Sequence, residues 1–211
     1  MGFSSASLGF TCWWWAELRR VFVVEARTAR PYPDFSLKDL PGSSGRLDVV
    51  CRCLVAALRG VGGVRRDTVF WAVLEGGGDP VALMVDGGRV GLLPGSELGV
   101  ARILGRVFRG ERVDGFSLEG AGFREVVGRV AGEAALFYLH EDGAPLWRVR
   151  APPAVAFVLG DHLGLPRESE ELLGGLGAIR VSLGPRRYLG SQCIVIVHYE
   201  LDRGVASPDA F

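Results

Sequence analysis

The chain has 211 residues, a formal net charge of zero, 23% charged residues and a mean hydropathy of +0.24. A domain of this length buries roughly 70% of its unfolded surface. The charged fraction and the positive mean hydropathy exclude a wholly disordered chain. The four scattered cysteines exclude a disulfide scaffold and favour a cytoplasmic location. Lys38 is the only lysine among the 24 basic residues.

The N-terminal stretch 1–16 is uncharged but shorter than the about 20 apolar residues that a membrane helix needs. It also lacks the basic start and the Ala-x-Ala exit of a secretory signal. We therefore expect residues 1–19 to form a disordered leader, and residues 20–211 to form a single domain with no membrane segment. In the alternative interpretation, Trp13, Trp14 and Trp15 dock on the domain or on a neighbouring molecule.

The first half of the domain alternates strands with helices. Residues 21–26 form a β-branched run that predicts a strand, and a proline-containing loop follows over residues 27–34. Ser43 and Ser44 lie in a turn and can cap a helix over residues 46–59, where apolar residues recur at helical spacing. The pattern then predicts strands over 68–74 and 81–85, an amphipathic helix over 98–108, and a strand over 134–139.

The last third begins with residues 155–159, an all-apolar run typical of a strand buried on both faces of a parallel sheet. An acidic helix over 167–173 and a strand over 178–183 follow. Residues 190–202 fit either a strand or a helix, because periodicity alone does not decide between them. Strands that alternate with helices predict an α/β fold with a mostly parallel sheet.

Several common chemistries lack their signatures. The chain has no Gly-x-Gly-x-x-Gly after a strand and no Walker loop. Cys51 and Cys53 would point about 200° apart on their helix, and no second ligand pair accompanies them, so we expect no metal site. Cys193 and His198 are a conceivable nucleophile–base pair, but no orienting acid is evident, and a buried structural cysteine is the commoner outcome.

Three blocks of sequence, taken in this order and spacing, are specific. They are residues 37–53 (LKDLPGSSGRLDVVCRC), residues 157–164 (FVLGDHLG), and residues 181–185 (VSLGP) followed by 193–197 (CIVIV) and 200–202 (ELD). Together they resemble the archaeal tRNA pseudouridine N1-methyltransferases (TrmY family) of the SPOUT superfamily. The similarity extends over about residues 20–202.

The resemblance implies a fold, a cofactor and a reaction. SPOUT proteins have an α/β sheet whose C-terminal part is tied in a deep trefoil knot, and they bind S-adenosyl-L-methionine there as homodimers. The family methylates N1 of pseudouridine in the T-loop of tRNA. The positions of this chain that match the cofactor loops of the family are Leu139, Gly160, Leu183, Gly184, Pro185, Leu189 and Cys193. This chain has Ser191-Gln192 where the family usually has Asn-His, and Gly184-Pro185-Arg186 where it commonly has Ser-Pro-Leu.

Asp48 and Arg46 are the polar residues that we expect nearest the target base. Asp48 can accept a hydrogen bond from the base edge, and Arg46 can offset charge on the ring; alternatively, Asp48 only pairs with Arg52 on the helix surface. The arginines expected to contact tRNA are Arg65 and Arg66 in a loop, and Arg102 and Arg106 on one face of a helix. In the alternative interpretation, this helix face is only exposed to solvent. Two other functions stay open: a methyltransferase of ribosomal RNA pseudouridine, and a non-catalytic RNA-binding protein that kept the fold.

Overall fold

The computed structural model describes residues 19–205, with side chains placed over residues 19–203. The leader expected over residues 1–19, with its three tryptophans, lies outside this part of the chain except for Arg19, which begins the first strand. Among the described residues, no helix is both long enough and apolar enough to cross a membrane.

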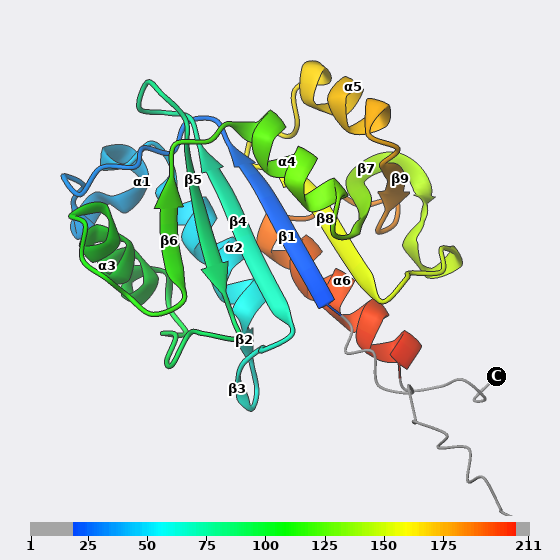
Figure 1. Cartoon of the computed structure of the whole chain (residues 1–211), viewed down its shortest axis with the longest axis horizontal. Helices are drawn as coiled ribbons and strands as arrows, with labels where there is room; N and C mark the ends of the chain where they lie inside the picture. Colours follow the sequence, from blue (N-terminus) through cyan, green and yellow to red (C-terminus); the bar gives the residue numbers. More distant parts are fainter. Residues whose placement is uncertain (1–18, 206–211) are drawn as a thin grey trace, which may run out of the picture.

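A seven-stranded sheet occupies the centre of the molecule in the order β6-β5-β4-β1-β8-β7-β9 (Figure 1). Its strands are β1 (Arg19–Ala26), β4 (Thr68–Leu74), β5 (Val81–Asp86), β6 (Phe116–Glu119), β7 (Ala135–Pro145), β8 (Ala154–Gly160) and β9 (Ile179–Ser182). Strands β4, β1, β8, β7 and β9 run parallel, whereas β5 is antiparallel to both of its neighbours. The mostly parallel α/β sheet is therefore confirmed. Its parallel strands bring their carboxyl ends to one edge, which is where α/β proteins bind ligands.

Helices cover both faces of the sheet (Figure 1). On one face lie α2 (Leu47–Leu58), α3 (Glu97–Phe108) and α6 (Gly190–Val205), and on the other lie α4 (Phe123–Ala131) and α5 (Arg167–Gly175). The side chains of β1 alternate between the two layers, with Phe22 and Val24 under α2 and Val21 and Val23 under α4. Short elements complete the fold: η1 (Leu37–Asp39), α1 (Leu40–Ser43), the hairpin β2 (Arg59–Gly60) and β3 (Gly63–Val64), and η2 (Leu146–Arg148).

A row of aromatic rings on the sheet packs against α6. Phe137, Phe157 and Phe22 lie directly opposite one another on β7, β8 and β1, with ring centroids 5.3 and 6.1 Å apart along the row. The rings of His198 in α6 and Phe22 pack edge to face, with their centroids 4.9 Å apart. Offset aromatic pairs of this kind add to the stability that burial supplies.

The segment 190–202, which the sequence left ambiguous, is helical. Ile194, Val197, His198 and Leu201 are all buried and share one helix face, so packing against α2 and the sheet outweighs the strand propensity of the β-branched run. The predicted helix over residues 46–59 is confirmed as α2, with the Ser44 hydroxyl accepting a hydrogen bond from the Leu47 amide at 3.1 Å.

Besides the short elements, strand β6 and helix α4 were missing from the prediction. The apolar residues of α4 (Phe123, Val126, Val127 and Val130) do recur at helical spacing, so its signal was present. Strand β6 is short and half-buried at the sheet edge, which leaves little apolar pattern to detect.

Strand β7 continues beyond its predicted end at residue 139 through an irregularity. Leu139 and Ala144 both pair with Val181 of β9, so the intervening residues bulge out of the ladder. A Cβ at Gly143 would lie 2.4 Å from the Val181 carbonyl carbon, so only glycine fits this crossing. The bulge turns the charged residues after Leu139 toward the carboxyl edge of the sheet.

Candidate active site

A cavity of about 490 Å³ lies at the carboxyl ends of β7, β8 and β9. Four of the residues expected to contact a cofactor line it: Leu139, Leu183, Gly184 and Cys193. The walls also include His140, Glu141 and Leu165, which the sequence did not single out, together with Leu163 of the motif 157–164 and Arg187 and Tyr188, which lie between the expected contacts Pro185 and Leu189. The cavity thus combines an apolar part made of leucines with a charged rim.

Bare backbone faces this cavity at Gly184. Its φ of 124° suits only glycine, and a Cβ built there would meet no atom within 4 Å. The amide of Gly184 donates to the Ser182 hydroxyl at 3.2 Å, which holds the loop in place. A ligand can therefore approach the main chain of this loop closely.

Gly160, Pro185 and Leu189 belong to the same loops but do not line the cavity. A Cβ at Gly160 would lie 2.1 Å from the Gly164 carbonyl carbon, so this glycine lets the loop over residues 160–164 fold back on itself. Pro185 is exposed, and the exposed Leu189 donates its amide to the Gln192 side chain at 2.9 Å.

Cys193 is not part of a nucleophile–base pair. Burial raises the pKa of its thiol to about 11, so the thiol stays protonated at neutral pH. His198 is buried, with Nδ1 2.9 Å from the Arg20 guanidinium and Nε2 2.9 Å from the Ala57 carbonyl oxygen. Because a guanidinium only donates, Nδ1 accepts and Nε2 carries the proton. No group of three or more His, Cys, Asp or Glu residues within 19–205 is placed to hold a metal ion.

Arg46 and Asp48 lie at the start of α2. The Asp48 side chain is only 1% exposed and accepts hydrogen bonds from Arg46 Nε at 2.9 Å, Arg46 Nη2 at 3.0 Å and Arg52 Nη2 at 2.8 Å. Arg52 Nη1 continues this network to Glu97 of α3 at 2.8 Å. The contact with Arg46 and the helix-surface pair with Arg52 therefore coexist.

The charge state of Asp48 follows from these contacts. Burial raises the pKa of the carboxyl, but the hydrogen bonds and charges of Arg46 and Arg52 outweigh burial and hold the pKa below its ordinary value. Asp48 is thus a carboxylate that orients Arg46. Arg46 itself has a φ of 72°, a left-handed conformation that is costly for any residue with a side chain and that tends to occur at functional sites.

The arginines expected to contact RNA are dispersed. Arg65 and Arg66 precede β4, at the sheet edge opposite the cavity, where Arg65 pairs with Asp202 at 2.9 Å and Arg66 donates to the Val90 carbonyl at 2.6 Å. Arg102 and Arg106 are exposed on α3, where Arg106 pairs with Glu111 at 2.7 Å. The structure therefore does not gather these four side chains into one patch beside the cavity.

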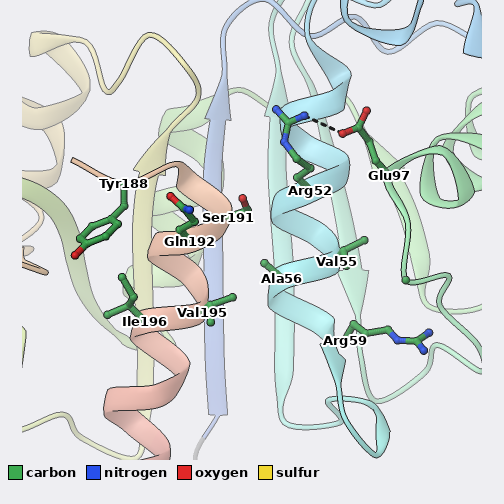
Figure 2. A pocket seen from close by; sticks show the side chains of 11 residues that line it. Arg52, Val55, Ala56, Arg59, Glu97, Tyr188, Ser191, Gln192, Val195 and Ile196 are labelled. Carbon is green, nitrogen blue, oxygen red and sulfur yellow. Dashed lines mark hydrogen bonds and ion pairs between the residues drawn. The ribbon is translucent and has the colours of Figure 1, made fainter. Parts of the chain in front are cut away.

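A second hollow, of about 660 Å³, lies between α2 and α6 (Figure 2). Its walls are mostly apolar, from Val55 and Ala56 on α2 and Val195 and Ile196 on α6, and Arg52 closes one end. Tyr188 lines this hollow as well as the first cavity. Sequence reasoning missed it because it depends on how two helices far apart in the sequence pack together.

A family model of SAM-dependent RNA methyltransferases matches residues 19–206, so the chain belongs to this family. It is 39% identical over 197 residues to the tRNA (pseudouridine(54)-N(1))-methyltransferase of Thermococcus kodakarensis, covering 87% of this chain and 98% of that protein. It is 37% identical over 196 residues to the Thermococcus gammatolerans enzyme of the same name, covering 87% and 96%. The enzyme so named from Methanococcus vannielii is 36% identical over 193 residues, covering 86% and 98%.

The fold is similar to that of Archaeoglobus fulgidus Nep1, whose crystal structure is of a complex with S-adenosylhomocysteine. The TM-score is 0.62 at 17% sequence identity, and the match covers 90% of this chain and all of the other. The resemblance to methyltransferases that the sequence motifs indicated is thereby confirmed at the level of family and fold.

Proposed function

We propose that this protein is a tRNA (pseudouridine(54)-N(1))-methyltransferase. The observation that carries the proposal is 36–39% identity, over nearly their whole length, to three enzymes of that name. The blocks that first indicated the family lie at the start of α2 and around the cavity at the carboxyl edge of the sheet.

The cavity fits S-adenosyl-L-methionine, which supplies an electrophilic methyl group on a sulfonium when bound. Leu139 and Leu183 offer apolar surface for an adenine ring, and the open backbone at Gly184 lets main-chain groups reach the ligand. Cys193 contributes a neutral thiol to the wall. A deep trefoil knot through the loops around this cavity is part of the proposal.

For the reaction, N1 of the target base must lose its proton, which passes to solvent water, and positioning supplies most of the rate. Arg46 is the residue that we place against the base, where its guanidinium offsets the negative charge that develops on the ring. Asp48 fixes the planar fork of Arg46 by its two hydrogen bonds, and Arg52 fixes Asp48 in turn. The oxygens of Asp48 already accept three hydrogen bonds and the pKa of the carboxyl is lowered, so we assign Asp48 positioning rather than proton transfer.

The proposal includes a homodimer. Leu189, Val195 and Tyr199 are 63%, 56% and 61% exposed at or along α6, more apolar surface than a solvent-facing helix of this length needs. A second copy packed on this face would also close the Arg46 side of the site, which one chain leaves open to solvent. We further propose a cytoplasmic enzyme that binds tRNA through local arginines, since the net charge is zero. Because Arg65, Arg66, Arg102 and Arg106 do not form one patch beside the cavity, they would contact parts of the tRNA away from the target base.

Methyl transfer from labelled S-adenosylmethionine to two pseudouridine-containing transcripts, a tRNA and a small-subunit ribosomal RNA hairpin, tests this assignment against its alternatives. Label in the tRNA alone supports the proposal. Label in the ribosomal hairpin alone would favour an rRNA enzyme, and label in neither would favour a non-catalytic RNA-binding protein.

A further inference from the structure

An ion pair spans the rim of the cavity between two of its loops. Arg187, in the loop after β9, donates from Nε and Nη2 to the two carboxylate oxygens of Glu141, in the bulge of β7, both at 2.8 Å. Both residues line the cavity. Their side chains are 86% and 52% exposed, and exposed ion pairs contribute little to folding stability. A role in stability alone therefore does not account for this arrangement.

The rest of the cavity complements the pair. Leucines 139, 163, 165 and 183 provide its apolar wall, so a ligand that fills it has a flat apolar part and a charged end. The other acidic residue of the wall, Glu170, already lies 3.6 Å from Arg180 and 3.8 Å from His140. Arg186 is a further cation of the lining, and Glu141 and Arg187 are the opposite charges of the lining that hydrogen-bond to each other.

We infer that Glu141 and Arg187 bind the amino-acid end of the cofactor, Glu141 taking its α-ammonium group and Arg187 its α-carboxylate. This inference rests on the proposed function. A guanidinium fork suits a carboxylate because it donates two parallel hydrogen bonds, and ligand binding would exchange the two that Arg187 donates to Glu141 for two to the ligand carboxylate. Arg187 also lowers the pKa of Glu141 through its hydrogen bond and charge, so the acid is ionised and ready to pair with an ammonium group.

Calorimetry with two nucleosides tests the inference. S-adenosylhomocysteine carries the amino-acid end, whereas 5′-methylthioadenosine has the same adenosyl thioether without it. We expect Arg187→Ala and Glu141→Ala each to weaken S-adenosylhomocysteine binding about tenfold or more, as expected for a lost charge-assisted contact. Binding of methylthioadenosine should stay within about twofold of the wild type.

Two further variants separate recognition from structure. Arg167→Ala removes another exposed arginine that is paired at 2.8 Å with a glutamate, Glu171, and should change neither affinity. The double variant Glu141→Arg with Arg187→Glu keeps an ion pair but exchanges the positions of its charges. Its affinity for S-adenosylhomocysteine should remain as low as that of the single variants. Full affinity in the double variant, or in Arg187→Ala, would overturn the inference and leave the proposed function intact. A folded wild type that binds neither nucleoside would overturn the proposed function itself.

Discussion

Arg46 donates two hydrogen bonds to Asp48, from Nε to Oδ1 at 2.9 Å and from Nη2 to Oδ2 at 3.0 Å, although its own backbone is left-handed. Asp48 is buried and charged, while the guanidinium of Arg46 remains partly exposed. The arrangement presents a planar, preorganised cation at the carboxyl edge of the sheet. It predicts that the two residues act as a unit.

Replacement of Asp48 by alanine should lower turnover about a hundredfold or more, the range expected for lost positioning contacts. It should also lower the free energy of unfolding by about 2 kcal/mol, since hydrogen bonds to a buried charge are lost. Affinity for S-adenosylhomocysteine should barely change. Single-turnover methylation, calorimetry and thermal melts on one preparation check all three. Full activity in a destabilised Asp48→Ala protein would reduce this residue to a structural role.

Arg46→Gly should lower both activity and stability. Glycine adopts a φ of 72° without steric cost, but the buried Asp48 carboxylate loses two of its three hydrogen bonds, so the melting temperature should fall while turnover drops about a hundredfold or more. Arg46→Lys should also fail to restore turnover, because an ammonium group does not reproduce the planar fork. An active Arg46→Gly enzyme would show that the guanidinium does not serve the reaction.

Gly160→Ala should weaken cofactor binding through the loop rather than by filling the cavity. Its Cβ would lie 2.1 Å from the Gly164 carbonyl carbon and 2.4 Å from the Leu165 amide nitrogen, so the loop over residues 160–164 must move. We expect a lower melting temperature together with weaker S-adenosylhomocysteine binding. Gly128→Ala in α4 is the matched control, because a Cβ there meets no atom within 4 Å and the residue lies outside the cavity. Equal behaviour of the two variants would contradict the steric argument.

The pH dependence of stability should reflect two buried groups that oppose each other. Burial lowers the pKa of His198 to about 4, so the unfolded chain binds the proton more readily and stability falls as the pH drops from 6.5 to 4. Burial raises the pKa of Glu25 to about 7, so the folded protein binds that proton more readily and stability rises as the pH drops from 7 to 4.5. The two effects nearly cancel in the wild type.

Removing one of the two groups should reveal the effect of the other on the pH dependence of stability. In Glu25→Gln the His198 effect remains, and the free energy of unfolding should fall by about 3 kcal/mol between pH 7 and pH 4. Denaturant titrations at several pH values measure this slope. A slope in Glu25→Gln no steeper than that of the wild type would contradict the opposing roles of the two residues.

The limits of sequence-based prediction can be traced to particular residues. The parallel strands other than β7, and helix α2, have apolar patterns that report burial directly, so these elements were predicted almost to their ends. Arg46 and Asp48 were found from a motif, but the left-handed φ of Arg46 and the third donor to Asp48 depend on the folded backbone.

Other contacts of the site had no detectable signal in the sequence. Glu141 and Arg187 meet because β7 bulges against β9, and nothing in their local sequence indicates a contact 46 residues away. The hollow between α2 and α6 likewise exists only once residues 190–205 are helical, which the β-branched run obscured. Long-range pairing and the packing of helices, rather than local propensity, determine these features.

The most direct test of the account is methylation of two synthetic T-arms that differ only at position 54. One carries pseudouridine, whose N1 bears a hydrogen, and the other carries uridine, whose N1 is bonded to the sugar and cannot accept a methyl group. After incubation with the enzyme and S-adenosylmethionine, mass spectrometry should show one added methyl group, at that nucleotide, in the pseudouridine arm alone. Methylation of the uridine arm, or of neither arm by a folded protein that binds the cofactor, would contradict the assignment.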